Sequence, residues 1–298
     1  MTQIERREAR LRRIHTQHYK DRKPTVKEVA TTPHVMGKSQ NYPKNIPLFL
    51  RKHSEDPAVK VIPLIHRLDN IHLIGQDFVP KLKEHILPRI QDMLRREAAL
   101  NPDAYAGQSS TRDYGTKFPA RDSIFFKNDR MYHHPLAKLN YTTYDVRRAQ
   151  DVIHYGTSHC DVMLLANTGD SDHPFLYARV IGIYHVNVIY TGEGMLDYNA
   201  RRVDFLWVRW FSYDDGRSIR WEDLKLDSVH FPPMAMEGAF GFADPRDVLR
   251  GCHIVPAFAR GKVHSDEVGL SRCVGDAHDW RHYYVNRCAT IQLLLAFY

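Results

Sequence analysis

The clearest alternation of apolar and polar positions lies in residues 177–213. Strand-forming residues fill most of positions 180–190, and in residues 203–210 successive side chains fall on alternate faces of an extended chain. Period-two alternation of aromatic and β-branched residues is typical of antiparallel strands with at least one buried face. A Gly-rich turn that includes Gly192 and Gly194 separates the two runs and predicts a hairpin loop.

Residues 77–101 carry the strongest helical pattern. Apolar residues recur every four positions on one face, at Leu82, Ile86, Ile90 and Leu94. This spacing predicts an amphipathic helix. Pro88 predicts a kink or a break in it, because proline has no backbone donor and crowds the preceding turn. Residues 46–53 predict a second, shorter helix.

Shorter strand patterns continue along the rest of the chain, at residues 124–127, 130–134, 138–146, 161–165, 252–258 and 281–285. Asp244 and Pro245 suit an N-cap and a first turn, and predict a short helix within residues 242–250. Many short strands with one short helix are typical of a small barrel. The expected fold class is therefore α+β: a helical, partly disordered basic N-terminal third followed by an antiparallel, SH3-like or BAH-like, partly closed β-barrel.

The same patterns divide the chain into four parts. Residues 1–101 are expected to form a basic helical and tether region, and residues 102–121 a polar linker. Residues 122–287 form the β-rich domain, and residues 288–298 form an apolar tail.

The charge is unevenly distributed along the chain. The 298 residues have a net charge of +7, yet residues 1–100 hold 20 Lys or Arg against 11 Asp or Glu, and the remainder holds 22 against 24. If the chain has electrostatic affinity for nucleic acid or chromatin, this affinity is therefore expected mainly in the first third. Its most basic segment contains Arg6, Arg7, Arg10, Arg12 and Arg13.

Cysteine content and hydropathy bear on the compartment. Four cysteines in 298 residues are too few for a secreted disulfide scaffold. The N-terminus lacks the apolar core of a signal peptide, and no apolar run reaches the ~20 residues of a membrane-spanning helix. A nuclear or cytoplasmic protein, neither secreted nor membrane-bound, is expected.

Two groups of residues suggest reactive chemistry. Cys273, His278, His282 and Cys288 have a metal-like composition, but their spacing is not that of a standard zinc module, and surface histidines with small buried cysteines are the favoured interpretation. Cys160 with His154 and His159 could form a nucleophile pair, but Cys160 precedes an apolar strand and fits a core position better. No catalytic residue, metal site or cofactor is therefore expected.

The aromatic residues of the central hairpin allow two interpretations. Tyr184, Tyr190, Trp207 and Trp210 could supply a cage for a methylated lysine or a stacking platform for bases. Filling of a small core is the favoured interpretation, because large aromatics dominate the burial in cores of this size.

Five blocks of sequence resemble one fungal family. They are NYTTYDVRRAQDVIHYGTSHCDVMLLA (140–166), HPFLYARVIGIYHVNVIYTG (173–192), RRVDFLWVRWF (201–211), GAFGFADPRDVLRGCHIVPAFARGK (238–262) and DWRHYYVNR (279–287). They are similar to the region that follows the transposase domain in Plavaka-type, CACTA-related transposon proteins of mushroom-forming fungi. Residues 34–53 and 81–90 resemble the segment just before that region.

This resemblance implies a role without catalysis. The acidic catalytic residues of the family belong to an upstream RNase H-like domain, so none can be carried over to this chain. Residues 61–76 interrupt the family pattern and residues 288–298 replace its acidic continuation, which makes both segments candidates for translated introns.

The expected function is therefore that of a non-enzymatic, transposon-derived fragment, with or without a selected function. The alternatives are a chromatin or nucleic-acid binding module, which would use the basic arm and the aromatics, and an accessory protein encoded in a fungal gene cluster.

Overall fold

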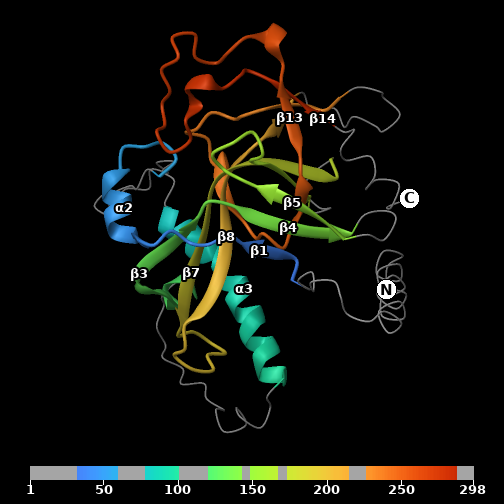
Figure 1. Cartoon of the computed structure of the whole chain (residues 1–298). Helices are drawn as coiled ribbons and strands as arrows, with labels where there is room; N and C mark the ends of the chain where they lie inside the picture. The colour runs from blue at the N-terminus through green and yellow to red at the C-terminus, as the bar shows by residue number, and fades with distance from the viewer. Residues whose placement is uncertain are drawn as a thin grey trace, which may run out of the picture.

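A single long strand, β7 (Phe175–Tyr190), organises the fold. The structure is a computed structural model, and it describes residues 32–59, 78–100, 120–142, 148–166, 173–214 and 226–286. Along one edge, β7 pairs with β8 (Arg201–Trp210). The other edge is shared: β6 (Asp161–Leu165) pairs with the first part of β7, and β3 (Ile124–His134) pairs with the second. All these pairings are antiparallel (Figure 1).

The described strands form three sheets. The seven-stranded sheet has the path β11-β8-β7-β3-β2, extended by β6 and β12. Its remaining strands are β2 (Lys44–Asn45), β11 (Phe240–Ala243) and β12 (Val248–Gly251). A three-stranded sheet contains β1 (His34–Met36), β4 (Ala137–Thr142) and β5 (Arg148–Ile153). A four-stranded sheet contains β13 (His253–Pro256), β14 (Tyr283–Asn286), β10 (Ser228–His230) and β9 (Ser212–Tyr213).

A bulge in β7 changes which side chains face each layer. The pairing of β7 with β8 shifts register between Val180 and Gly182. Val180 before the shift and Ile183 after it both pack toward the three-stranded sheet, whereas Tyr184 packs on the opposite side. The side chain of Tyr184 also lies over Gly182, where an added Cβ would overlap the ring. The bulge thus lets one strand serve two cores without a break.

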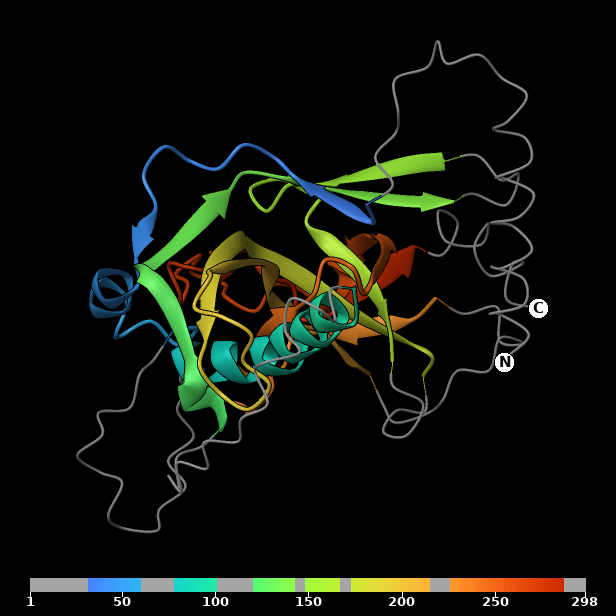
Figure 2. The same ribbon diagram turned by 90° about the horizontal axis from the view of Figure 1, so that it is seen from below.

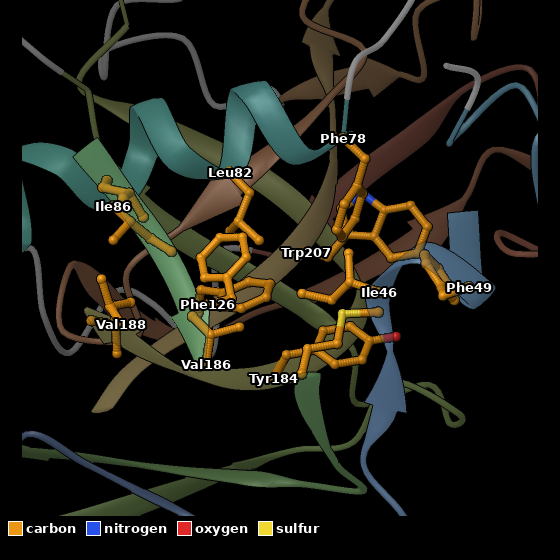
Figure 3. Close-up of a cluster of buried hydrophobic side chains, with 14 of the residues drawn as sticks. Ile46, Phe49, Phe78, Leu82, Ile86, Phe126, Tyr184, Val186, Val188 and Trp207 are labelled. Atoms are coloured by element: carbon orange, nitrogen blue, oxygen red, sulfur yellow. The ribbon is translucent and has the colours of Figure 1, made fainter. Parts of the chain in front are cut away.

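Helix α3 (Phe78–Leu100) covers one face of the seven-stranded sheet. Its residues Leu82, Ile86 and Ile90 are fully buried, as their four-residue spacing requires. Figure 3 shows Leu82 pointing toward Phe126 and Phe78 beside Trp207, with Ile46 and Phe49 of the short helix α2 (Ile46–Lys52) in the same core. The three-stranded sheet covers the opposite face of the central sheet, as Figure 2 shows. Residues on both sides of the expected 102–121 linker therefore share one core.

Several local expectations are confirmed. Residues 46–53 and 77–101 form helices α2 and α3, and residues 177–213 form the β7–β8 hairpin with its loop at Gly192 and Gly194. Val203, Phe205 and Trp207 face one core, and Leu206 and Val208 face another, as their alternation predicts. A kink or a break was expected at Pro88, and the break is wrong, because α3 continues through this residue.

The expected fold class, α+β with a helical N-terminal third and a partly closed SH3/BAH-like barrel, is wrong. The described residues are mostly strands with only two α-helices, and no described sheet closes on itself. The physical reason is that β7 and β8 bury both faces, one under α3 and one under the three-stranded sheet. A sheet with a separate layer on each face stays open, whereas a small barrel directs one face inward onto itself. The expected helical segment within residues 1–31 and the tail at 288–298 lie outside the described residues.

The helix expected within residues 242–250 is also wrong. Residues on either side of Asp244 are used by β11 and β12, which pair with β8 and β6. Asp244 instead closes a tight turn: its carboxylate accepts the Arg246 backbone N–H at 2.9 Å and pairs with Arg89 of α3. Strand pairing on both sides overrides the local N-cap signal.

Replacement of Leu82 by Ala is expected to destabilise the protein by about 2–5 kcal/mol, because it leaves a cavity between α3 and the sheet. Urea denaturation followed by circular dichroism measures the change. Leu100→Ala is the matched control, since Leu100 ends the same helix and is 80% exposed; it should change stability by no more than about 0.5 kcal/mol. Equal effects of the two substitutions would contradict the assigned helix face.

Candidate functional site

The outer face of the four-stranded sheet carries a group of polar side chains. Tyr213 and Tyr283 flank Val229 in the paired strands, and all three pack into the apolar cluster beneath the sheet. Side chains alternate along a strand, so their sequence neighbours point the other way. These neighbours are Asp214, Ser228, His230 and His282.

Three of them converge on one carboxylate. His230 Nδ1 donates to Asp214 Oδ1 at 2.6 Å, and His282 Nδ1 donates to Asp214 Oδ2 at 2.6 Å. The Ser228 hydroxyl also donates to Oδ2, and Arg260 Nη1 lies 3.1 Å from it. We call Asp214, His230 and His282 the acid–histidine cluster.

Hydrogen bonds keep the carboxylate of this cluster ionised. Burial alone would raise the pKa of Asp214, but the bonds from Ser228, His282 and His230 outweigh it and hold the pKa below its ordinary value. The Asp214 side chain is 15% exposed, and those of His230 and His282 are 35% and 31% exposed. The cluster thus presents one fixed negative charge and two imidazoles at a position that solvent can reach.

A second group joins the end of α2 to the loop before β14. Asp56 accepts the Ser271 hydroxyl at 2.6 Å and the backbone N–H of Cys273 at 3.0 Å. The Cys273 sulfur lies 3.4 Å from His53 Nδ1. Burial, and then the nearby charge of Asp56, raises the pKa of Cys273 to about 12, so the thiol stays protonated. We call His53, Asp56 and Cys273 the thiol cluster.

A buried ion-pair network lies between the seven-stranded and four-stranded sheets. Arg179 donates to both oxygens of Asp161, at 2.8 and 3.2 Å, and Arg209 pairs with Asp279. Both guanidinium groups lie over the ring of Phe231, with centroid distances of 5.0 and 4.0 Å. Burial lowers the pKa of Arg179, but Asp161 more than compensates and raises it above its ordinary value. The charged groups of this network pair with one another and have a structural role.

Three buried histidines occupy the β3–β7 pairing. His134 Nδ1 donates to the Gly37 carbonyl at 2.7 Å, so its Nε2 accepts the Nδ1–H of His185 at 2.7 Å. In this arrangement His134 is neutral, because an Nε2 that accepts a hydrogen bond carries no proton. Burial is the main cause that lowers the pKa of both His133 and His185 to about 4.

The residues expected to bind or react have scattered positions. Arg6, Arg7, Arg10, Arg12 and Arg13 lie outside the described residues. Tyr184, Tyr190 and Trp207 are each 3% exposed and fill the core under α3, where their faces are covered by protein. Trp210 is half-buried against the core on the other face.

The described residues do not bring together either of the two groups that were considered for reactive chemistry. The nearest polar partner of the Cys160 sulfur is Asp161 Oδ1 at 3.8 Å, and burial raises the pKa of Cys160 to about 12. Cys273 and His282 belong to two different clusters, His278 is exposed, and Cys288 lies outside the described residues.

Sequence reasoning missed the acid–histidine cluster. The sequence Asp-Asp-Gly that begins at Asp214 predicts a turn, and His230 lies in a strand of only three residues. The available signal was the alternation in Ser-Tyr-Asp (212–214), Ser-Val-His (228–230) and His-Tyr (282–283), which places a polar residue opposite each inward apolar one. Only the strand register shows that these segments are neighbours.

Comparisons with known proteins give no relative. No protein-family model, no curated protein and no solved structure matches the chain. No helix in the part of the chain that the structure describes is long and apolar enough to cross a membrane.

The buried histidines predict a loss of stability in mild acid. The folded protein keeps His133 and His185 neutral to about pH 4, whereas in the unfolded chain they take up protons near pH 6.5. The unfolded state therefore binds more protons in this window, and the free energy of unfolding should fall as the pH drops from about 6.5 to about 4. Thermal melts across this range measure it.

His133→Phe should make this pH dependence shallower, because it removes one of the groups that must stay neutral. His278→Ala is the matched control at an exposed position and should leave the slope unchanged. Carboxylates titrate mainly below this window, so a slope that persists unchanged in His133→Phe would contradict the assignment to buried histidine.

Proposed function

We propose that the chain is a non-enzymatic, transposon-derived β-rich module. The observation that carries the proposal is the state of its thiols. Burial raises the pKa of Cys160 and of Cys273 to about 12, and it raises that of Cys252 well above the ordinary value. The thiolate is the nucleophile in cysteine chemistry, so all three are poor nucleophiles at neutral pH.

The placement of the buried acids supports the same proposal. Asp161 and Asp279 are engaged by Arg179 and Arg209, and Asp56 is engaged by the 271–273 loop. A general acid or base must be able to reach a proton of the substrate. These carboxylates are hydrogen-bonded to neighbouring strands and loops, and we infer that they stabilise the fold and do not transfer protons to a substrate.

The transposon part of the proposal rests on the sequence resemblance. The five resembling blocks fall on β4 to β6, β7, β8, β11 to β13 and β14, which are nine of the fourteen described strands in the three sheets. Because the resembling blocks lie mainly on strands, the resemblance supports the same fold for this region in the transposon proteins and in this chain. The thiols of Cys160, Cys252 and Cys273 are free, which supports a nuclear or cytoplasmic location.

Thiol labelling tests the non-enzymatic proposal. In a Cys288→Ala background, the three remaining thiols should react with a thiol reagent at pH 7 more slowly than the same thiols in the guanidinium-unfolded chain. Mass spectrometry of the labelled peptides gives the rate for each cysteine. A single thiol that reacts faster in the folded protein than in the unfolded chain would mark an activated nucleophile and overturn the proposal.

A second candidate function is the binding of nucleic acid or chromatin. The observation in its favour is the charge of residues 1–100, with 20 Lys or Arg against 11 Asp or Glu. If the five arginines of residues 6–13 contact phosphates, log K should fall with log salt with a slope of about −4.5.

Fluorescence anisotropy with a labelled DNA duplex measures this binding. Deletion of residues 1–23 should abolish it, whereas replacement of Arg95 and Arg96, which are exposed on α3, should change it little. Absence of binding by the full chain at low salt would exclude this candidate.

A further inference from the structure

The acid–histidine cluster gathers metal-binding atoms from three separate strands. Asp214 directly follows β9, His230 ends β10, and His282 directly precedes β14. One donor atom from each residue lies within 4.8 Å of the other two. The three strands are hydrogen-bonded neighbours in the order β14-β10-β9, so the sheet itself fixes their spacing.

The donor set has the composition of a transition-metal site. Two neutral imidazoles and one carboxylate suit zinc and its neighbours in the first row, whereas magnesium and calcium prefer oxygen ligands alone. Ligand bonds to zinc are about 2.0–2.2 Å long, so tetrahedral ligands lie roughly 3.3 Å apart. The present 2.6 Å contacts would have to open by about 0.7 Å, which partly exposed histidines can accommodate.

We propose that Asp214, His230 and His282 bind one zinc-class divalent cation, which cross-links β9, β10 and β14 on the outer face of the four-stranded sheet. In this site the proton of each imidazole would move from Nδ1, which now donates to the carboxylate, to Nε2, and the Nδ1 lone pair freed in this way would bind the cation. The Ser228 hydroxyl, which donates to Asp214 Oδ2, would hold the carboxylate in orientation. The fourth position would be left to water.

The thiol cluster is a weaker candidate for the same ion. Its carboxylate, Asp56, already accepts the Ser271 hydroxyl and the backbone N–H groups of Ala58 and Cys273. A cation there would have to replace bonds that hold the 271–273 loop to the end of α2. In the acid–histidine cluster, a cation would replace the hydrogen bonds among its own ligands and compete with the exposed Arg260, and neither change releases a loop.

One neighbouring charge opposes cation binding and gives the proposal a distinctive test. Arg260 Nη1 lies 3.1 Å from Asp214 Oδ2, and the Arg260 side chain is 45% exposed. This guanidinium competes with a cation for the carboxylate. Arg260→Ala should therefore bind zinc more tightly than the unmodified chain, although it loses a hydrogen bond to the cluster.

Titration of the metal-free full chain with Zn²⁺, read by calorimetry and by metal analysis after dialysis, tests the proposal. We expect one zinc per chain. The double variant His230→Ala/His282→Ala should lose this zinc, and Ser228→Ala should weaken it by about 10- to 100-fold. Mg²⁺ should not compete. His53→Ala/Cys273→Ala is the matched control at the thiol cluster and should keep full affinity.

Two further measurements separate loss of the site from loss of the fold. Circular dichroism must show the same spectrum for the double variant and the unmodified chain, and otherwise His230→Gln and His282→Gln take its place. Cobalt(II) bound to the unmodified chain should give a spectrum without a thiolate charge-transfer band. No zinc binding, zinc binding that persists in the histidine variants, or a thiolate band would each overturn the proposal, and so would weaker binding by Arg260→Ala. None of these results depends on the thiol-labelling experiment.

Discussion

Burial of both faces of the β7–β8 pair is the constraint on which the rest of the fold depends. Tyr184 and Phe205 face the helix α3, and Val180 and Leu206 face the three-stranded sheet. Each face must be covered by a separate layer, because exposed apolar area costs about 25 cal/mol per Å². Helices α2 and α3 supply the layer on one face, and the three-stranded sheet supplies the layer on the other, so the central sheet remains open. Described residues on both sides of the 102–121 segment share the core under α3.

The ion pairs of Arg179 and Arg209 extend this constraint to the third sheet. Beneath the four-stranded sheet, charged side chains lie beside the apolar cluster. Each of them must pair with an opposite charge, because an unpaired buried charge destabilises the fold by roughly 3–5 kcal/mol. Asp161 comes from the seven-stranded sheet, and Asp279 comes from the segment before β14. The network therefore fixes where the four-stranded sheet lies against β7 and β8, and with it the positions of the residues on the outer face.

Local patterns were sufficient for the long elements and insufficient for their arrangement. The four-residue spacing from Leu82 to Leu94 and the alternation from Val203 to Trp210 each carry many repeats, so the periodicity identified α3 and β8. Asp244 shows the limit: its N-cap signal is correct for the turn, but the strands on either side are set by partners distant in sequence. The same applies to the overall fold, because nothing local shows that β6 and β3 share one edge of β7.

The acid–histidine cluster follows the same rule at the level of single residues. Asp214, His230 and His282 are ordinary in sequence and meet only because Tyr213, Val229 and Tyr283 are drawn inward by the apolar cluster beneath them. A one-residue slip of any of these strands would turn its polar residue inward, and a slip of β9 would bury the charge of Asp214. The hydrogen bonds of the cluster are also complete without a cation. The sheet can therefore fold first and bind metal afterwards, unlike zinc modules whose folding requires the ion.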